Sequence, residues 1–208
     1  MKNKDAAAGH PIGRPDKKYV ILALFGKSGS GKDTIRNKLL ELYPDTYQRL
    51  VAYTTRPPRI GEVDGQDYCF VSPDEFGRLV LNYSMLEATC FQSVEDSWFY
   101  GTNINSLSLD KINIGVFNPA AIEILLDDNR LHVIPILIKA SDKVRLLRQL
   151  NREQHPNCEE VCRRFLADQK DFYDFSFDYY KVINDNEYAL ETVPLEINNY
   201  VDNLIKSS

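Results

Sequence analysis

The chain is 208 residues long, and its 43% hydrophobic and 26% charged residues are typical of a single globular domain with a substantial core. The formal net charge is −5, which argues against binding nucleic acid through a broad basic surface. The sequence has no apolar stretch of membrane-spanning length, and its polar beginning lacks the pattern of a signal peptide. We therefore expect a cytoplasmic protein that binds neither nucleic acid nor membranes.

The beginning of the chain predicts a loose tail followed by a buried strand and a helix. Residues 1–18 are polar and interrupted by glycine and proline, so we expect a flexible tail and one domain over residues 19–208. The continuous apolar run at 19–25, YVILALF, predicts a strand buried on both faces, as in a parallel sheet. Residues 32–42 predict a helix, because isoleucine and leucine recur on one side and a proline follows shortly.

The rest of the chain alternates apolar runs with helical patterns, which is typical of a parallel α/β sheet. Strands are predicted at 112–117, 131–138 and 179–183, and helices at 119–126, from Ser141 as a cap to 150, and at 159–174. A segment at about 50–102 interrupts the alternation with prolines, glycines and aromatic residues. It predicts a small β-rich insertion with one helix, which begins at Ser72 with Glu75 in the capping-box position.

Residues 26–32, GKSGSGK, fit the P-loop pattern of glycine, four residues, glycine and lysine. They lie between a predicted strand and a predicted helix, which favours a P-loop over an ordinary glycine-rich turn. The glycines allow backbone N–H groups to point at phosphate oxygens, and the helix N-terminus adds partial positive charge. The Lys32 side chain can reach the β- and γ-phosphates of ATP. The predicted ATP-binding residues in this segment are Gly26, Ser28, Gly29, Ser30, Gly31, Lys32, Asp33 and Thr34.

The residue after Lys32 is Asp33, whereas a P-loop usually has serine or threonine there to contact Mg²⁺. Asp33 could bind Mg²⁺ directly or through water, or it could repel the triphosphate when no metal is present. Thr34 could instead supply the hydroxyl group that contacts the metal. The sequence leaves these alternatives open, so Asp33 and Thr34 are both candidate Mg²⁺ ligands.

The stretch at 54–70, TTRPPRIGEVDGQDYCF, carries the most specific pattern in the chain. Arg56 and Arg59 are forked donors suited to a phosphate monoester, and Tyr68 can donate a further hydrogen bond. Two arginines alone would also fit a basic surface loop. The whole stretch, however, resembles the guanylate kinases, because it meets every fixed position of their pattern TTRxPRxGExxGxDYxF.

The resemblance extends from residue 19 to about residue 190 and implies a three-layer P-loop kinase fold with a parallel sheet. It also implies that the insertion at about 50–102 binds the acceptor and that a lid at about 148–164 carries arginines. In this family a glutamate accepts hydrogen bonds from the Watson–Crick edge of guanine, and Glu87 matches it. The acceptor-binding residues implied by the resemblance are Arg56, Arg59, Glu62, Tyr68, Glu87, Tyr100, Thr102 and Asn118.

Two positions on the acceptor side depart from the family pattern. Ala52 stands where the family has a serine that hydrogen-bonds guanine. Asn118 stands where the family has an acidic residue that supports Mg²⁺ and the acceptor. The resemblance therefore implies guanine recognition with one contact fewer, and a Mg²⁺ site with less negative charge.

Arg148 and Arg152 are four residues apart and lie on one predicted helical face, and Arg164 is on the following helix. These three match the arginines of the family's mobile lid, which neutralise charge on the transferred phosphoryl group. Together with Lys32 they are the predicted catalytic residues, the alternative for each arginine being a solvated helix charge. Asn184, which is followed by aspartate, matches a family asparagine near the adenine of ATP.

The resemblance implies a kinase that uses ATP and Mg²⁺ to convert GMP or dGMP to the diphosphate, with small nucleotides as partners. A homodimer is compatible with the sequence. A ribose bisphosphate phosphokinase is one alternative, because those enzymes can also show Gly-Lys-Asp in the P-loop and asparagine at the strand end. Another nucleoside monophosphate kinase is a second alternative. A non-catalytic guanylate-kinase-like binding module is a third, but such domains have lost the P-loop that this chain retains.

The cysteines offer a weaker signal. His155, Cys158 and Cys162 are close enough in the sequence to suggest zinc. A fourth ligand is not evident, so reduced thiols of a cytosolic protein are the favoured interpretation.

Overall fold

The computed structural model describes residues 18–59, 61–92, 97–152, 155–186 and 188–207. Its main sheet has five parallel strands in the order β2-β7-β1-β8-β9. The strands are β1 (Tyr19–Phe25), β2 (Tyr47–Arg49), β7 (Ile112–Val116), β8 (Leu131–Lys139) and β9 (Tyr180–Ile183). The central strand β1 forms a continuous apolar run because both of its faces are covered, and its five residues from Ile21 to Phe25 have no exposed surface.

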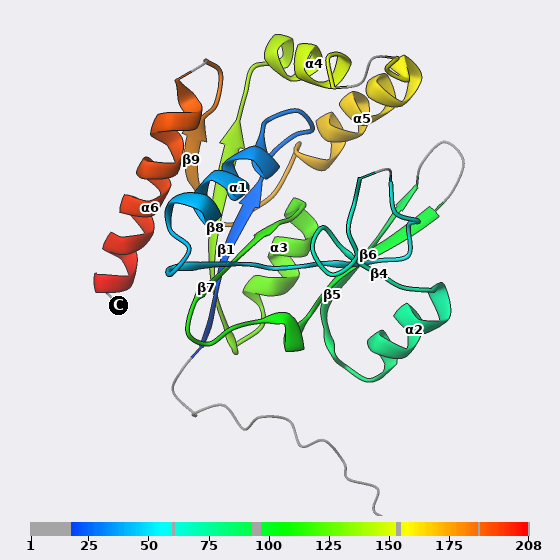
Figure 1. The fold of residues 1–208 in the computed structure, drawn as a ribbon, viewed down its shortest axis with the longest axis vertical. Helices are drawn as coiled ribbons and strands as arrows, with labels where there is room; N and C mark the ends of the chain where they lie inside the picture. The colour runs from blue at the N-terminus through cyan, green and yellow to red at the C-terminus, as the bar shows by residue number, and fades with distance from the viewer. Residues whose placement is uncertain (1–17, 60, 93–96, 153–154, 187, 208) are drawn as a thin grey trace, which may run out of the picture.

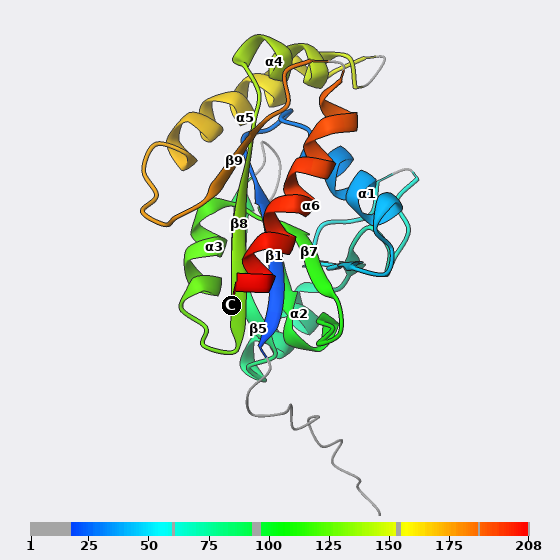
Figure 2. The same ribbon diagram turned by 90° about the vertical axis from the view of Figure 1, so that its left-hand side faces the viewer.

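Helices cover both faces of this sheet, so the main body has three layers (Figures 1 and 2). On one face, α1 (Lys32–Leu42) and α6 (Ala189–Ser207) bury leucine, isoleucine and valine against the strands. On the other face, α3 (Pro119–Leu126) packs with aromatic residues that follow α5 (Cys158–Asp171). The fold class is therefore the predicted one, a layered α/β domain around a parallel sheet.

A second, smaller sheet lies beside the main body (Figure 1). Its strands have the order β4-β3-β6-β5 and are β3 (Tyr53–Thr54), β4 (Cys69–Phe70), β5 (Met85–Gln92) and β6 (Ser97–Asn103). Helix α2 (Pro73–Leu81) packs on β5 and β6, and it is capped as predicted by Ser72, whose hydroxyl oxygen accepts a hydrogen bond from the Glu75 N–H. A short 3-10 turn, η1 (Ile104–Ser106), follows β6.

Two elements of the main body are absent from the sequence-based prediction, and the predicted cap Ser141 takes its expected position without the expected side-chain hydrogen bond. Strand β2 has only three residues, and helix α6 contains Pro194, so neither gives a clear local pattern. Ser141 precedes α4 (Asp142–Leu150), but its side chain makes no capping hydrogen bond. Its N–H donates instead to the carboxylate of Asp185, from the turn after β9. None of the helices in the described ranges is long and apolar enough to cross a membrane.

Candidate active site

The P-loop connects β1 to α1 at the carboxyl edge of the main sheet, beside the point where the strand order reverses. Open α/β sheets bind ligands at such a switch point. Gly29 and Gly31 have φ angles of +79° and +94°, which L side chains rarely adopt. A Cβ atom on Gly29 would lie 2.5 Å from the Arg145 carbonyl oxygen, and one on Gly31 would lie 2.2 Å from Asn184 Nδ2. Glycine is therefore required here for both conformation and space.

Lys32 is folded back onto this loop. Its Nζ donates hydrogen bonds to the carbonyl oxygens of Gly26, at 2.6 Å, and Lys27, at 3.3 Å. Burial lowers the pKa of the Lys32 ammonium group, because desolvation disfavours its charged form. A phosphate group bound beside Lys32 would favour the charged ammonium form that burial disfavours. This lysine is therefore well suited to bind phosphate.

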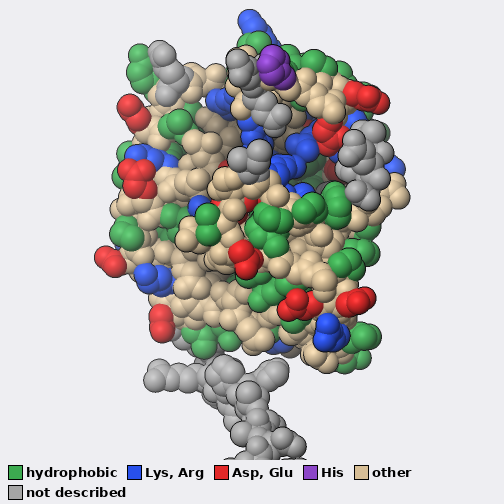
Figure 3. All heavy atoms as spheres, turned by 45° about the vertical axis from the view of Figure 1, so that its right-hand side comes forward, with side chains coloured by type: hydrophobic (Ala, Val, Ile, Leu, Met, Phe, Trp, Pro, Cys, Tyr) green, Lys and Arg blue, Asp and Glu red, His purple; other side chains and the backbone are tan. Residues whose placement is uncertain are grey.

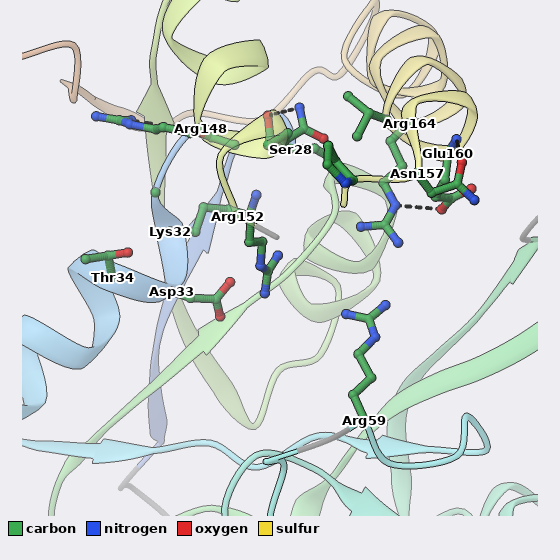
Figure 4. Close-up of a pocket in the computed structure, with 15 residues that line it drawn as sticks. Ser28, Lys32, Asp33, Thr34, Arg59, Arg148, Arg152, Asn157, Glu160 and Arg164 are labelled. Atoms are coloured by element: carbon green, nitrogen blue, oxygen red, sulfur yellow. Dashed lines mark hydrogen bonds and ion pairs between the residues drawn. The ribbon is translucent and has the colours of Figure 1, made fainter. Parts of the chain in front are cut away.

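A cavity of about 670 Å³ opens over the P-loop. Figure 3 shows Lys and Arg side chains gathered in a hollow on this face of the molecule, and Figure 4 shows the residues that line the cavity. The three predicted lid arginines, Arg148 from α4, Arg152 just after it and Arg164 from α5, all line it together with Lys32. Arg59 enters it from the opposite side, from the loop that precedes β4 (Figure 4).

Glu160 organises the arginines of α5, a role for which no sequence motif provides a signal. Its carboxylate accepts hydrogen bonds from Arg163 Nε at 2.7 Å and from Arg164 Nε at 2.6 Å. These two guanidinium groups, Arg163 first, lower the pKa of Glu160 to about 2 although partial burial opposes the shift. Arg164 is therefore held in an ion pair at the wall of the cavity.

A second cavity, of about 440 Å³, lies between the carboxyl edge of the main sheet and the second sheet. Its lining includes most of the residues predicted to bind the acceptor: Arg56, Arg59, Tyr68, Glu87, Tyr100, Thr102 and Asn118. The Arg56 guanidinium lies over the Tyr68 ring, 5.4 Å from its centroid. Ala52 also lines this cavity, where the family pattern has serine.

Glu62 supports the loop that carries the two arginines. Its carboxylate accepts from Arg56 Nη2 at 2.9 Å and from the Arg59 backbone N–H at 2.7 Å. Desolvation alone would raise the pKa of Glu62, but these hydrogen bonds outweigh it and the pKa is lowered. Glu62 therefore orients the two arginines instead of lining the acceptor cavity itself.

Glu87 lies on β5 with its side chain almost fully buried, at 8% exposure for the residue. Its Oε1 accepts a hydrogen bond from Thr102 Oγ1, on the neighbouring strand β6, at 2.8 Å. Burial raises the pKa of the Glu87 carboxyl group, and hydrogen bonds from Thr102 and Thr89 partly oppose this. A buried carboxylate with one oxygen directed by threonine can accept hydrogen bonds from a planar base that enters the cavity.

Asn118 has a structural use at its position. Its side-chain oxygen accepts a hydrogen bond from the Ala121 N–H at 2.7 Å and so caps the N-terminus of α3. Asn and Asp serve equally well as helix caps, so the exchange of an acidic residue for asparagine leaves the helix intact. Compared with the family pattern, this exchange removes a negative charge from the lining of the acceptor cavity.

The two cavities meet at the residues that line both of them. The shared residues are Ser28, Lys32, Asp33, Arg59, Glu160 and Arg164. A group bound over the P-loop and a group bound near Glu87 would therefore approach each other between a lysine and two arginines. Such a cationic junction suits the transfer of an anionic group from one ligand to the other.

Asp33 is the residue at this junction that fits a Mg²⁺ ion. Its side chain is 68% exposed, forms an ion pair with Arg36 Nη2 at 3.1 Å, and offers hard oxygen ligands to both cavities. Thr34 lines only the P-loop cavity. The described residues contain no group of three or more His, Cys, Asp and Glu side chains that could hold a metal. Mg²⁺ commonly binds to one or two carboxylates plus substrate phosphates, so the single carboxylate is compatible with it.

The suggested zinc ligands lie at and just before the start of α5. Cys158 and Cys162 are exposed free thiols at the start of α5, and they form no metal-binding group with His155 or any other described residue.

Asn184 and a pair of charged residues form hydrogen bonds with the P-loop backbone. Asn184 is 2% exposed, and its Nδ2 donates to the Ser30 carbonyl oxygen at 2.7 Å. Arg145 and Asp168, which the sequence analysis did not identify as site residues, contact Ser28. Asp168 falls on the apolar face of the helix predicted at 159–174. A charged residue on such a face is unusual, and this could have identified Asp168 as a candidate site residue.

Comparisons with known proteins agree with this geometry. The family model described as guanylate kinase matches residues 16–200. A guanylate kinase from Chlamydia abortus is 32% identical over 196 residues, which cover 89% of this chain and 90% of that protein. One from Gloeobacter violaceus is 38% identical over 123 residues, and there the match spans only about half, 53%, of the relative's length. The crystal structure of guanylate kinase from Anaplasma phagocytophilum superimposes with a TM-score of 0.58 at 26% identity, covering 89% of this chain and 87% of that one. The chain therefore belongs to the guanylate kinase family.

Proposed function

We propose that this protein transfers the γ-phosphoryl group of ATP to GMP or dGMP, giving ADP and GDP or dGDP. The observation that carries the proposal is the meeting of a P-loop cavity and a Glu87-containing cavity at Lys32, Arg59 and Arg164. A donor triphosphate over the P-loop and an acceptor monophosphate near Arg59 would face each other at this junction. Membership of the guanylate kinase family supports the same reaction.

In this mechanism the attacking group is a phosphate oxygen of the acceptor, so no protein nucleophile is needed. Arg56, Arg59 and Tyr68 hold the acceptor phosphate in line with the γ-phosphoryl group, which makes the reaction effectively unimolecular. Lys32 and the lid arginines stabilise the negative charge of the transferred group. Mg²⁺, held by Asp33 and the nucleotide phosphates, would neutralise further phosphate charge when bound.

Glu87 selects the base. Its carboxylate accepts from the N1–H and the amino group of guanine together, whereas the unprotonated N1 of adenine would oppose it as a second acceptor. Thr102 keeps one carboxylate oxygen in place through its 2.8 Å hydrogen bond. A buried carboxylate left without a donor is costly, so guanine is favoured over adenine.

The proposal extends to the parts of the chain and to its surroundings. Residues of about 50–102 serve as the acceptor-binding unit, and residues of about 148–164 serve as the lid. The tail predicted at residues 1–18 lies, apart from Lys18, outside the described residues. ATP with Mg²⁺ is the donor, the partners are small nucleotides, and the protein acts in the cytoplasm as a monomer or homodimer.

The test is a panel of acceptors with ATP and Mg²⁺, read by coupled ADP release. We expect kcat/KM for GMP and dGMP to exceed the values for AMP, UMP and ribose bisphosphate. The Glu87→Gln variant should lose most of this preference, because an amide offers only one acceptor oxygen. The Cys90→Ser variant, which changes an exposed residue of the same strand outside the cavity lining, should retain it.

The panel also separates the alternatives. A preference for ribose bisphosphate or for another monophosphate would replace the acceptor and leave the P-loop kinase in place. If the protein binds ATP but releases no ADP with any of these acceptors, the result would support a binding module and contradict the proposed reaction.

A further inference from the structure

The third residue of the P-loop, Ser28, is held from both sides by a buried ion pair. Its backbone N–H donates to Asp168 Oδ2 at 2.8 Å, and its hydroxyl donates to Asp168 Oδ1 at 3.2 Å. Its carbonyl oxygen accepts from Arg145 Nε at 2.9 Å. Arg145 Nη2 in turn donates to Asp168, which closes a ring of interactions, here named the Ser28 clamp.

The ion pair of this clamp is inside the protein. The Arg145 side chain is 1% exposed and the Asp168 side chain is 12% exposed. All three guanidinium nitrogens of Arg145 are engaged, because Nη1 donates to Asp142 Oδ1 at 2.7 Å. The same guanidinium lies 5.0 Å from the centroid of the Phe165 ring. Buried ion pairs contribute little net stability compared with apolar residues of similar size, so this one calls for another explanation.

The position of the clamp relative to the lid gives that explanation. Arg145 lies on α4, three residues before Arg148, and Asp168 lies on α5, four residues after Arg164. Residues three and four apart share a helix face, so each clamp residue is one turn from a lid arginine. Both lid helices are thus tied to a single residue of the loop that cradles phosphate.

We propose that Arg145 and Asp168 are positioning residues, which hold the P-loop in register with Arg148 and Arg164 so that phosphate cradle and lid arginines act on the same phosphoryl group. This inference rests on the proposed kinase function. Ser28 lines both cavities, so a displacement of this residue moves the junction at which transfer occurs. Displacements of about 1 Å can cost a hundredfold in rate. Asp168 and Ser28 also line the acceptor cavity, but the hydrogen bonds of Glu87 come from Thr102 and Thr89, so the clamp should act mainly on the rate of transfer.

The decisive variant removes both charges together, Arg145→Met with Asp168→Leu. A single removal would leave an unpaired buried charge and destabilise the fold, whereas a paired apolar replacement beside Phe165 preserves packing. The control is Arg130→Met with Asp128→Leu, an Arg–Asp pair at the start of β8 whose Nη2–Oδ2 distance is 2.6 Å. That pair lies at the edge of the sheet opposite the P-loop, so its removal should leave kcat unchanged.

Three measurements are made on the intact chain: thermal unfolding, amide hydrogen exchange of Ser28, and steady-state kinetics with ATP and GMP. For the clamp variant we expect a melting temperature within about 5 °C of wild type. We expect Ser28 exchange at least about tenfold faster, because its N–H has lost its acceptor. We also expect kcat lower by about tenfold or more, with KM for GMP within about twofold. Wild-type kcat, or a lower kcat without faster Ser28 exchange, would overturn the proposal.

Asp168→Asn is the second variant, and it decides the matter if the double variant does not fold. Arg145 keeps its ion pair with Asp142, so the variant leaves no unpaired buried charge. The pair with residue 168 is lost, and a neutral amide oxygen is a weaker acceptor for the Ser28 N–H than a carboxylate. We expect faster Ser28 exchange and a lower kcat, and wild-type values of both would overturn the proposal. If the wild-type chain transfers phosphate to no acceptor, the kinase function fails by itself. Ser28 exchange and ATP affinity by calorimetry then decide on the clamp, which predicts ATP binding at least about fivefold weaker in the clamp variant.

Discussion

The two loops that we propose to bind phosphate are built in opposite ways. The P-loop is crowded, since a Cβ atom on Gly31 would come within 2.2 Å of Asn184, whose buried side chain donates to the loop. The loop of the acceptor arginines is open, and nothing in the described part of the chain lies within 4 Å of a Cβ atom on Gly65. Both glycines have positive φ, but only in the P-loop does the surrounding core also fix the position.

The difference indicates how each site is prepared for its ligand. The P-loop is held from the outside, by Asn184 and by the buried pair of Arg145 and Asp168. The acceptor loop holds itself, through the carboxylate of Glu62, which binds Arg56 and the Arg59 backbone. Changes on the donor side should therefore affect ATP binding and the rate of transfer, whereas changes on the acceptor side should affect acceptor binding.

The largest effect is expected on the donor side, from Lys32→Ala. Removing a charge that meets the transferred phosphoryl group should lower kcat by about a hundredfold or more. The fold should be unaffected, because within the described ranges the Lys32 ammonium group bonds to two loop carbonyls, and burial already lowers its pKa. Steady-state kinetics and thermal unfolding measure both. Lys38→Ala, on the same helix but paired with Glu41 at the surface, is the control. Near-normal turnover of Lys32→Ala would disprove the role of the P-loop.

On the acceptor side, the largest effect is expected from Arg59→Ala. A charge-assisted hydrogen bond to phosphate contributes about 1.5–3 kcal/mol, so KM for GMP should rise by about tenfold to a hundredfold. KM for ATP should change little, although Arg59 also lines the edge of the P-loop cavity.

Arg78→Ala is the matched control for this change, because Arg78 is an arginine of α2 that lines neither cavity and whose Nε donates to the Asp74 carbonyl oxygen at 3.4 Å. It should leave both KM values as they are. If Arg59→Ala weakened ATP binding more than GMP binding, the assignment of donor and acceptor sites would be wrong.

These two sites were also the parts that the sequence predicted best. The P-loop and the stretch at 54–70 are contiguous motifs, in which spacing along the chain already gives spacing in the site. Strand β1 and helices α1 and α3 were predicted with their observed bounds, because their apolar patterns and flanking residues are local. The positions of Glu87 and Thr102 opposite each other follow from the pairing of β5 with β6.

The remaining features depend on contacts between distant segments. Ser28 and Asp168 are separated by 140 residues, and no local pattern states that they meet. Strand β2 is defined by its pairing with β7, since three residues are too few to show a period. Helix α6 was missed because Pro194 lies inside it, although its buried valine and isoleucine complete the core.

The two glycines offer a direct test of the difference between the loops. Gly31→Ala combines an unfavourable φ of +94° with a collision at Asn184, and should raise KM for ATP by about tenfold or more. Gly65→Ala meets only the unfavourable φ of +74° in open space, which costs about 1–2 kcal/mol of stability. Thermal unfolding and KM values for both substrates distinguish them. Equal effects of the two variants on ATP binding would contradict the comparison.

A smaller effect is expected from pH on the acceptor side. Burial raises the pKa of Glu87, so its carboxyl group becomes protonated at a higher pH than an exposed glutamate. A protonated carboxyl group cannot accept both guanine hydrogens, and KM for GMP should therefore rise several-fold as pH falls from about 8 to about 5. KM for ATP should respond less. The response should be absent in Glu87→Gln, which has no titrating group there, and an identical pH profile in that variant would assign the effect to another residue.

The smallest effect is expected from restoring the family's serine at position 52. Ala52 lines the acceptor cavity together with Glu87, so a hydroxyl group there would face the same base. One additional neutral hydrogen bond contributes about 1 kcal/mol, which corresponds to about fivefold tighter GMP binding. Binding of AMP should not improve, because its base has no amino group in the position of the guanine one. Calorimetric titration of both nucleotides into wild type and Ala52→Ser measures the change, and Ala52→Val controls for added volume without a hydroxyl. Equal gains for GMP and AMP would place position 52 against the ribose or phosphate, and guanine recognition would then depend on Glu87 and Thr102.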